Sequence, residues 1–114
     1  MPRLPNPDQA HIDPRKLTAY LLSPFHPVGR FKASFFASLG YSAANARQLD
    51  ADLRVQHVTR AAHFVEDGTY GRKYEICAIL RGPNGRVRMV CSVWMVRNGE
   101  TWPRFVTAYP GGRP

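Results

Sequence analysis

The apolar residues of this 114-residue chain change their spacing near residue 60, and this change limits the folds that the chain can adopt. Beyond residue 60 apolar and polar residues alternate, which is the pattern of a β-strand. Short runs rich in Gly, Asn and Asp interrupt the alternation at residues 67–68, 82–85 and 98–99. We therefore predict four strands joined by short turns into an antiparallel meander. The predicted strands span residues 60–66, 72–81, 86–97 and 102–109.

The residues before the strands carry the signals that begin and end helices. Asp13 followed by Pro14 is typical of an N-cap and a first helical position, and Pro24 ends the short helix that follows. Apolar residues at three- and four-residue spacing predict two more helices, over about residues 29–39 and 42–57. The prediction is an α+β fold with three N-terminal helices packed on one face of a four-stranded antiparallel meander.

A chain of this length has room for one hydrophobic core, so residues 1–114 are predicted to form a single domain. It divides into an extended lead-in (residues 1–12), a helical half (13–58) and a sheet half (60–110). No apolar run has the length of a membrane span, and the first residues do not resemble an export signal. We therefore expect a cytoplasmic protein without a membrane partner.

The net charge of +8 is high for a chain of this size. Residues 1–65 and residues 66–114 each hold eight Lys or Arg and four Asp or Glu, so the charge belongs to the folded body rather than to a basic arm. A polyanion would relieve the self-repulsion of these cations, which favours RNA as a partner. The alternative is an Arg-rich protein whose composition reflects coding bias and which binds no nucleic acid.

The cysteines and histidines indicate no metal site. Cys77 and Cys91 fall on neighbouring predicted strands, and without an export signal we interpret both as reduced, buried side chains. The four histidines are scattered, and no cluster of Cys or carboxylates accompanies them. We therefore predict no cofactor and no metal, and any chemistry would be metal-independent.

The segment from His26 to Lys32 is the first candidate site. Its histidine stands on a proline-restricted loop, and Arg30 and Lys32 fall in the first turn of a predicted helix, where cations are unfavourable. A phosphate bound to the free N–H groups of that turn would explain them, with Gly29 allowing its close approach. The alternative is a solvated turn in which the histidine packs against Phe25.

The last predicted strand is the second candidate site. Alternation would place Phe105, Thr107 and Tyr109 on one face and Arg104 on the other. The Thr107 and Tyr109 hydroxyls are hydrogen-bond donors suited to phosphate, although such residues are also common on edge strands.

The other histidines and the tryptophans receive structural interpretations. His57 is placed near the end of the third helix, where a cationic side chain is favourable. His63 is interpreted as a packed strand residue and His11 as part of the lead-in. Trp94 is predicted to lie in the core, and Trp102 to make a contact at the start of a strand.

Long strings of the sequence resemble an uncharacterised bacterial domain family of about 110 residues. The resemblance covers nearly the whole chain. It lies in the string from Lys16 to Gly40, in Tyr70-Gly-Arg-Lys-Tyr74 and in the strand from Pro103 to Pro110. This resemblance implies no activity, because no function is established for that family.

The predicted architecture is similar to the barnase–EndoU–colicin–RelE group of metal-independent RNase toxins. The similarity implies an endoribonuclease toxin acting on RNA in a bacterial toxin–antitoxin or related conflict system. EndoU-like sites use two histidines. In this chain the second would have to be His57 or His63, or an Arg would replace it. The implied catalytic residues are His26, Lys32, Thr107 and Tyr109, and the implied substrate-binding residues are Gly29, Arg30 and Arg104.

A toxin of this charge implies an acidic antitoxin or immunity protein as its partner, because like charges slow association. The alternative function is a non-catalytic RNA- or protein-binding module of the same fold, similar to an antitoxin or immunity protein.

Overall fold

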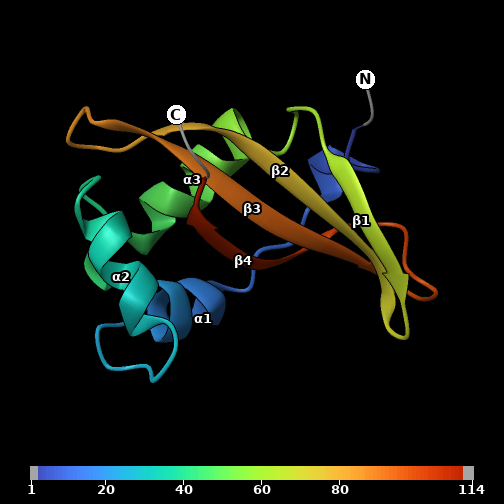
Figure 1. Cartoon of the computed structure of the whole chain (residues 1–114), viewed down its shortest axis with the longest axis horizontal. Coiled ribbons are helices and arrows are strands. Elements are labelled where there is room, and N and C mark those ends of the chain that lie inside the picture. Colours follow the sequence, from blue (N-terminus) through green and yellow to red (C-terminus); the bar gives the residue numbers. More distant parts are fainter. Residues whose placement is uncertain (1–2, 112–114) are drawn as a thin grey trace.

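The computed structural model describes residues 3–111. Helices precede a four-stranded antiparallel sheet, so the predicted α+β class and order of elements are confirmed (Figure 1). Residues 1–2 of the predicted lead-in and residues 112–114 of the predicted domain lie outside the described part. The helices are α1 (Pro14–Lys16), α2 (Arg30–Ala37) and α3 (Ala46–Gln56). Short turns of other helix types are Pro7–Gln9, Leu17–Leu21 and Ala43–Asn45.

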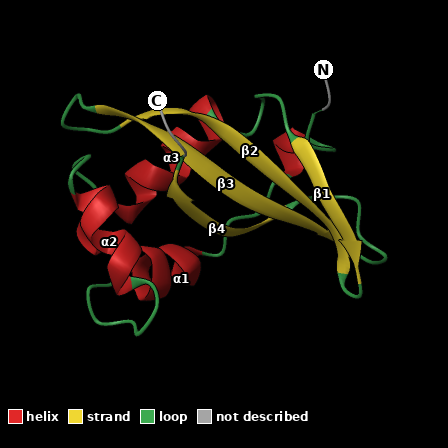
Figure 2. Ribbon diagram, in the orientation of Figure 1, coloured by secondary structure: helices red, strands yellow, loops and turns green. Residues whose placement is uncertain are grey.

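The sheet is the predicted meander, with each strand antiparallel to the next in the order β1-β2-β3-β4 (Figure 2). Its two central strands, β2 and β3, pair along their whole length. The first strand begins three residues later than predicted, at His63. The strands are β1 (His63–Gly68), β2 (Gly71–Arg81), β3 (Val87–Arg97) and β4 (Arg104–Pro110).

The core is built from buried side chains of both the helical half and the sheet. α3 contacts β2, whereas α1 and α2 contact the edge strand β4. Packing of all three helices on one face stays a prediction. Burial of each large apolar side chain stabilises the fold by about 1.5–3 kcal/mol. Core residues from the sheet include Ile76, Leu80, Val90, Trp94 and Phe105, and those from the helical half include Leu21, Phe36, Leu39, Leu49 and Leu53.

A β-bulge in β4 corrects the predicted faces of that strand. Thr107 pairs with Val93 of β3. Phe105 pairs with the neighbouring Trp94, so Val106 is an extra residue in β4. Because paired residues share a face, Phe105 lies on the core face with Trp94, and Thr107 lies on the opposite face. The alternation that placed Phe105 and Thr107 on one face was wrong.

The lead-in is more ordered than an extended segment. Leu4 and Ile12 are buried in the core, and Pro7–Gln9 forms a 3-10 turn between them. His11 and Arg104 form an isolated bridge that ties this segment to β4. The segment predicted as an extended lead-in therefore contributes side chains to the core.

Cys77 and Cys91 form a disulfide between β2 and β3. The two residues are direct partners in the sheet, which brings their Cα atoms within 4.0 Å. The interpretation of both cysteines as reduced was therefore wrong. Cys91 is buried, as predicted, whereas Cys77 is exposed. Disulfides persist mainly in oxidising environments.

His57 lies in a buried polar network instead of forming a cation at a helix end. Its side chain is fully buried, with Nδ1 2.8 Å from the Ser92 hydroxyl and Nε2 3.2 Å from the Ala78 carbonyl oxygen. The Ser92 hydroxyl also accepts a hydrogen bond from the indole of Trp94, whose predicted core position is confirmed. Desolvation lowers the pKa of His57 to about 4.

Candidate functional site

Three elements bring Lys32, Tyr20 and Thr107 together beside the edge strand. Lys32 lies in the first turn of α2, Tyr20 in the helical turn after α1, and Thr107 in β4. The Lys32 ammonium donates hydrogen bonds to Thr107 Oγ1 at 2.8 Å and to Tyr20 OH at 3.0 Å. The two hydroxyl oxygens are 3.3 Å apart, and all three side chains are partly buried. We call these three residues the Lys32 cluster.

The Lys32 cluster has N–H and O–H hydrogen-bond donors that are not used within residues 3–111. An ammonium group has three N–H donors, and within residues 3–111 acceptors are found for two of those of Lys32. No carboxylate of this described range lies within ion-pair distance of Lys32. The Tyr20 and Thr107 hydroxyls can use only one of their two protons on each other. The cluster can therefore donate at least two hydrogen bonds to an anion.

Tyr20 is the residue whose acidity this arrangement changes. Burial raises the pKa of its phenol, but the hydrogen bonds from Lys32 and Thr107 and the charge of Lys32 lower it more. The net result is a pKa below the ordinary value for tyrosine. Tyr20 was not among the predicted site residues. The only signal was a hydroxyl among leucines.

An open cleft of about 610 Å³ is lined by Tyr20 and Thr107 of the cluster, and Lys32 lies behind these two residues without lining it. Its rim is basic, since the one carboxylate there, Asp13, is held by Arg15 at 2.9 Å. That hydrogen bond lowers the pKa of Asp13 to about 2, so it remains ionised and paired. The cleft is lined by Asp13, Arg15, Lys16, Ala19, Tyr20, His26, Val106 and Thr107.

His26 lines the same cleft, with its ring edge-on to Tyr20 at 5.0 Å between centroids. Its Nδ1 accepts hydrogen bonds from the backbone N–H groups of Val28 and Gly29, each at 3.0 Å. An accepting nitrogen carries no proton, so the neutral ring has its proton on Nε2. In this conformation His26 can donate a hydrogen bond from Nε2, but accepting a proton at Nδ1 would break two hydrogen bonds.

The start of α2 is not open to a phosphate in this structure. The amide groups of residues 29–32 all have acceptors in the loop before the helix or in its first turn. Gly29 is buried, and its amide donates to the His26 ring. The predicted use of free N–H groups there was therefore wrong, because the histidine and the loop carbonyls occupy them.

The remaining predicted residues lie elsewhere. The Arg30 guanidinium stacks 4.7 Å from the Phe31 ring centroid and lines a different depression. Arg104 forms two hydrogen bonds of 2.8 Å with the Glu100 carboxylate. Tyr109 donates a hydrogen bond to Glu75 and does not line the cleft. The structure thus places Lys32, Thr107 and His26 at one site, and Arg30, Arg104 and Tyr109 outside it.

The described residues contain one group with the spacing of metal ligands. Ligand atoms of Glu75, Cys77 and Cys91 lie within 4.8 Å of one another. The two cysteines are joined in the disulfide, so they offer no thiolates to a metal in this state. The Lys32 cluster consists of a cation and hydroxyls, a donor set that suits an anion.

Replacing Gly29 by alanine tests how closely this loop approaches Tyr20. The added Cβ would lie 1.9 Å from the Tyr20 carbonyl oxygen, so the two segments must move apart. We expect a loss of about 2 kcal/mol in the free energy of unfolding, measured by urea denaturation. Gly68→Ala is the control, because its Cβ would meet nothing nearer than 3.4 Å. Equal stability of the two variants would contradict the close approach.

No helix within residues 3–111 is long and apolar enough to cross a membrane. A family model described as "Domain of unknown function (DUF6883)" matches residues 3–112. Neither a curated protein nor a solved structure matches the chain. The family match confirms the predicted resemblance to an uncharacterised domain family of about 110 residues. Because it covers nearly the whole sequence, the chain belongs to the DUF6883 family of domains of unknown function.

Proposed function

We propose that this domain is a metal-independent endoribonuclease that binds an RNA phosphate at the Lys32 cluster. The observation that carries the proposal is the Lys32 ammonium, which donates to the hydroxyls of two cleft-lining residues, Tyr20 and Thr107, and has no carboxylate partner in residues 3–111. A partly buried cation is costly unless an opposite charge compensates it. A phosphate in the cleft would supply that charge, and the net charge of +8 would attract a polyanion.

The geometry supports a transesterification in which the ribose 2′-oxygen attacks the adjacent phosphorus and the 5′-oxygen leaves. The products are a 2′,3′-cyclic phosphate and a 5′-hydroxyl. Lys32 and the Thr107 hydroxyl would stabilise charge on the non-bridging oxygens. Tyr20, in its ionised form, would take the proton of the 2′-hydroxyl, which its lowered pKa favours. The Nε2–H of His26 would donate a hydrogen bond to the phosphate. A solvent water would protonate the leaving 5′-oxygen to give the 5′-hydroxyl, and Tyr20 would return the proton that it took to solvent.

The biological setting of this proposal is a bacterial toxin–antitoxin or related conflict system. A basic toxin acting on cytoplasmic RNA calls for an acidic antitoxin or immunity protein, because opposite charges speed association. In a reducing cytoplasm the Cys77–Cys91 bridge would open, but neither cysteine lines the cleft.

Incubation of the purified protein with RNA in the presence of a strong chelator tests the proposed activity. We expect fragments that end in a 2′,3′-cyclic phosphate, because the proposed donors include no metal. The same products without the chelator serve as the control. RNA that stays intact at an equimolar concentration of protein would contradict the proposal.

The second candidate function is a non-catalytic RNA-binding module. It is favoured by the hydrogen bonds at His26 Nδ1, which leave this ring without a free basic nitrogen. Such a module would bind RNA in the same cleft and leave it uncut, so the chelator experiment combined with a binding assay separates the two functions.

A further inference from the structure

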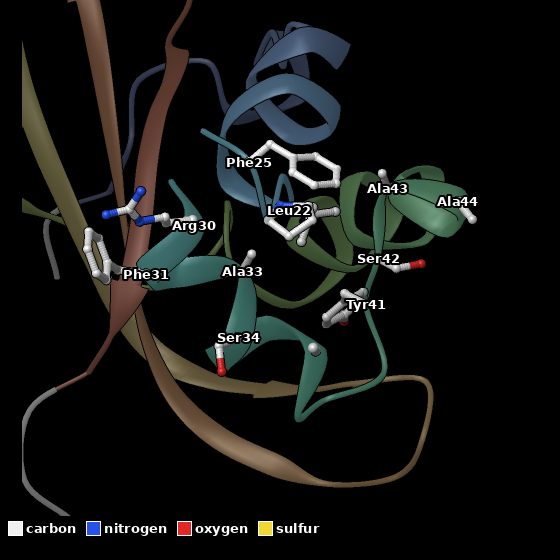
Figure 3. Close-up of a pocket in the computed structure, with 12 residues that line it drawn as sticks. Leu22, Phe25, Arg30, Phe31, Ala33, Ser34, Tyr41, Ser42, Ala43 and Ala44 are labelled. Carbon is white, nitrogen blue, oxygen red and sulfur yellow. The ribbon is translucent and has the colours of Figure 1, made fainter. Parts of the chain in front are cut away.

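A second depression, of about 760 Å³, borders the first turn of α2. Buried side chains of Leu22, Ala33 and Tyr41 lie at its base. Two phenylalanine rings stand at its walls although they are largely exposed, Phe25 at 88% and Phe31 at 69%. Figure 3 shows the Phe25 ring beside Leu22 toward one end, and Arg30 with Phe31 toward the other. We call this depression the Phe25 groove.

The lining of the Phe25 groove combines apolar rings with positive charge. Arg30 is the charged residue among the twelve that line it, and its guanidinium lies over the Phe31 ring. Ser34 also lines the groove, and this exposed residue offers a hydroxyl that can form a hydrogen bond with a ligand. Aromatic rings and a guanidinium are the groups on which the bases of single-stranded nucleic acids stack. An acidic ligand is favoured here by the charge of Arg30 and of the whole domain.

The Phe25 groove and the Lys32 cluster share a wall. Phe25 lines the groove, and His26, the next residue, lines the cleft. Phe31 likewise lines the groove, and the next residue, Lys32, belongs to the cluster. Both depressions therefore border the same short stretch of backbone, from Phe25 to Lys32. A single strand of nucleic acid that passes over this stretch would reach both.

We infer that the Phe25 groove binds the bases of single-stranded RNA next to the phosphate held by the Lys32 cluster. This inference rests on the proposed function for the position of the phosphate, and it adds the class of substrate. A duplex keeps its bases stacked on one another and cannot offer them to Phe25. The domain therefore selects single strands, with little preference for sequence, because every base has a face that can stack.

Binding of a fluorescein-labelled hexanucleotide, followed by anisotropy, tests the groove. The hexamer contains 2′-deoxyribose, so it cannot be cleaved through a 2′-hydroxyl. We expect Phe25→Ala to weaken binding about tenfold. Phe64→Ala, at a ring of β1 that is 54% exposed and lines neither depression, should leave the affinity unchanged. An abasic hexamer of equal charge should bind the wild-type protein and Phe25→Ala equally, because it has no base to stack.

Each outcome of this experiment has a distinct meaning. If the wild-type protein binds the hexamer and Phe25→Ala binds it equally well, the groove does not hold bases, while the phosphate site stands. The same holds if Phe25→Ala weakens the abasic hexamer as much as the normal one. Competition by a perfect duplex as strong as that by the single strand would also overturn the inference. If neither hexamer binds, the inference and the proposed RNA-binding function both fail.

Discussion

A protein in which Lys32 is replaced by methionine is expected to cleave RNA about a hundred to a thousand times more slowly than the wild-type protein. Methionine keeps a long apolar side chain but has no charge and no N–H donors. It would remove the group that donates to both Tyr20 and Thr107. The pKa of Tyr20 should then rise, because the charge and hydrogen bond of Lys32 lower it. The rate constant for cleavage of a labelled RNA measures the effect.

Lys73→Met is the matched control for this experiment. Lys73 lies on β2, where its ammonium is 3.7 Å from the Glu66 carboxylate, and it lines neither the cleft nor the Phe25 groove. Both variants lose one positive charge, so a general effect of charge on RNA binding would slow them equally. Equal rates for the two variants, with both folded by circular dichroism, would refute the special role of Lys32.

The second large effect is a loss of stability in mild acid that arises from His57. The unfolded protein binds a proton at this side chain near its ordinary pKa of 6.5, whereas the folded protein does so only near 4. The unfolded state therefore holds more protons between these values, and stability falls as the pH drops from about 6.5 to 4. The shift corresponds to about 3 kcal/mol, fully present above pH 6.5.

Urea denaturation at pH 7.0, 6.0, 5.0 and 4.5 measures this dependence. These pH values lie above the range in which the lowered pKa of Asp13, about 2 against 3.8, contributes. His63→Gln, which removes a histidine on the exposed strand β1, should keep the full dependence. His57→Gln should lose most of it and be less stable at pH 7, because Ser92 and Ala78 lose a partner. A free energy of unfolding that is constant from pH 7.0 to 4.5 in the wild-type protein would contradict the buried neutral state.

The sheet could be predicted well from the sequence because its signals are local. The alternating pattern and the Gly-containing turns placed β2 and β3 within one residue of their observed bounds. The bulge at Val106 could not be predicted, since it depends on the pairing with β3 and leaves no mark on the alternation. The disulfide was missed because the redox state was inferred from the start of the chain and not from the direct pairing of Cys77 with Cys91.

The candidate site could be predicted only in part, because it depends on contacts between distant segments. Lys32 was predicted from its unfavourable position in the first turn of a helix and Thr107 from its hydroxyl on the last strand, and the structure brings the two together. Tyr20 could not be distinguished from a core residue until the helical turn was placed against β4. The tautomer of His26 depends on which backbone amides donate to its Nδ1, and the sequence alone does not reveal these contacts. Tyr109 was predicted to share a site with Thr107 because the two residues lie two positions apart on a strand. In the structure its hydroxyl donates a hydrogen bond to Glu75 instead.

The most direct test of the Lys32 site is a nuclear magnetic resonance titration of the isotope-labelled protein with a 2′-deoxy dinucleotide. We expect the largest changes in chemical shift at Lys32, Thr107 and Tyr20. The competing location is the exposed β2–β3 turn with the start of β3, where Arg86 and Arg88 also carry positive charge. Changes centred on those two arginines, with Lys32 and Thr107 unmoved, would contradict the proposed phosphate site.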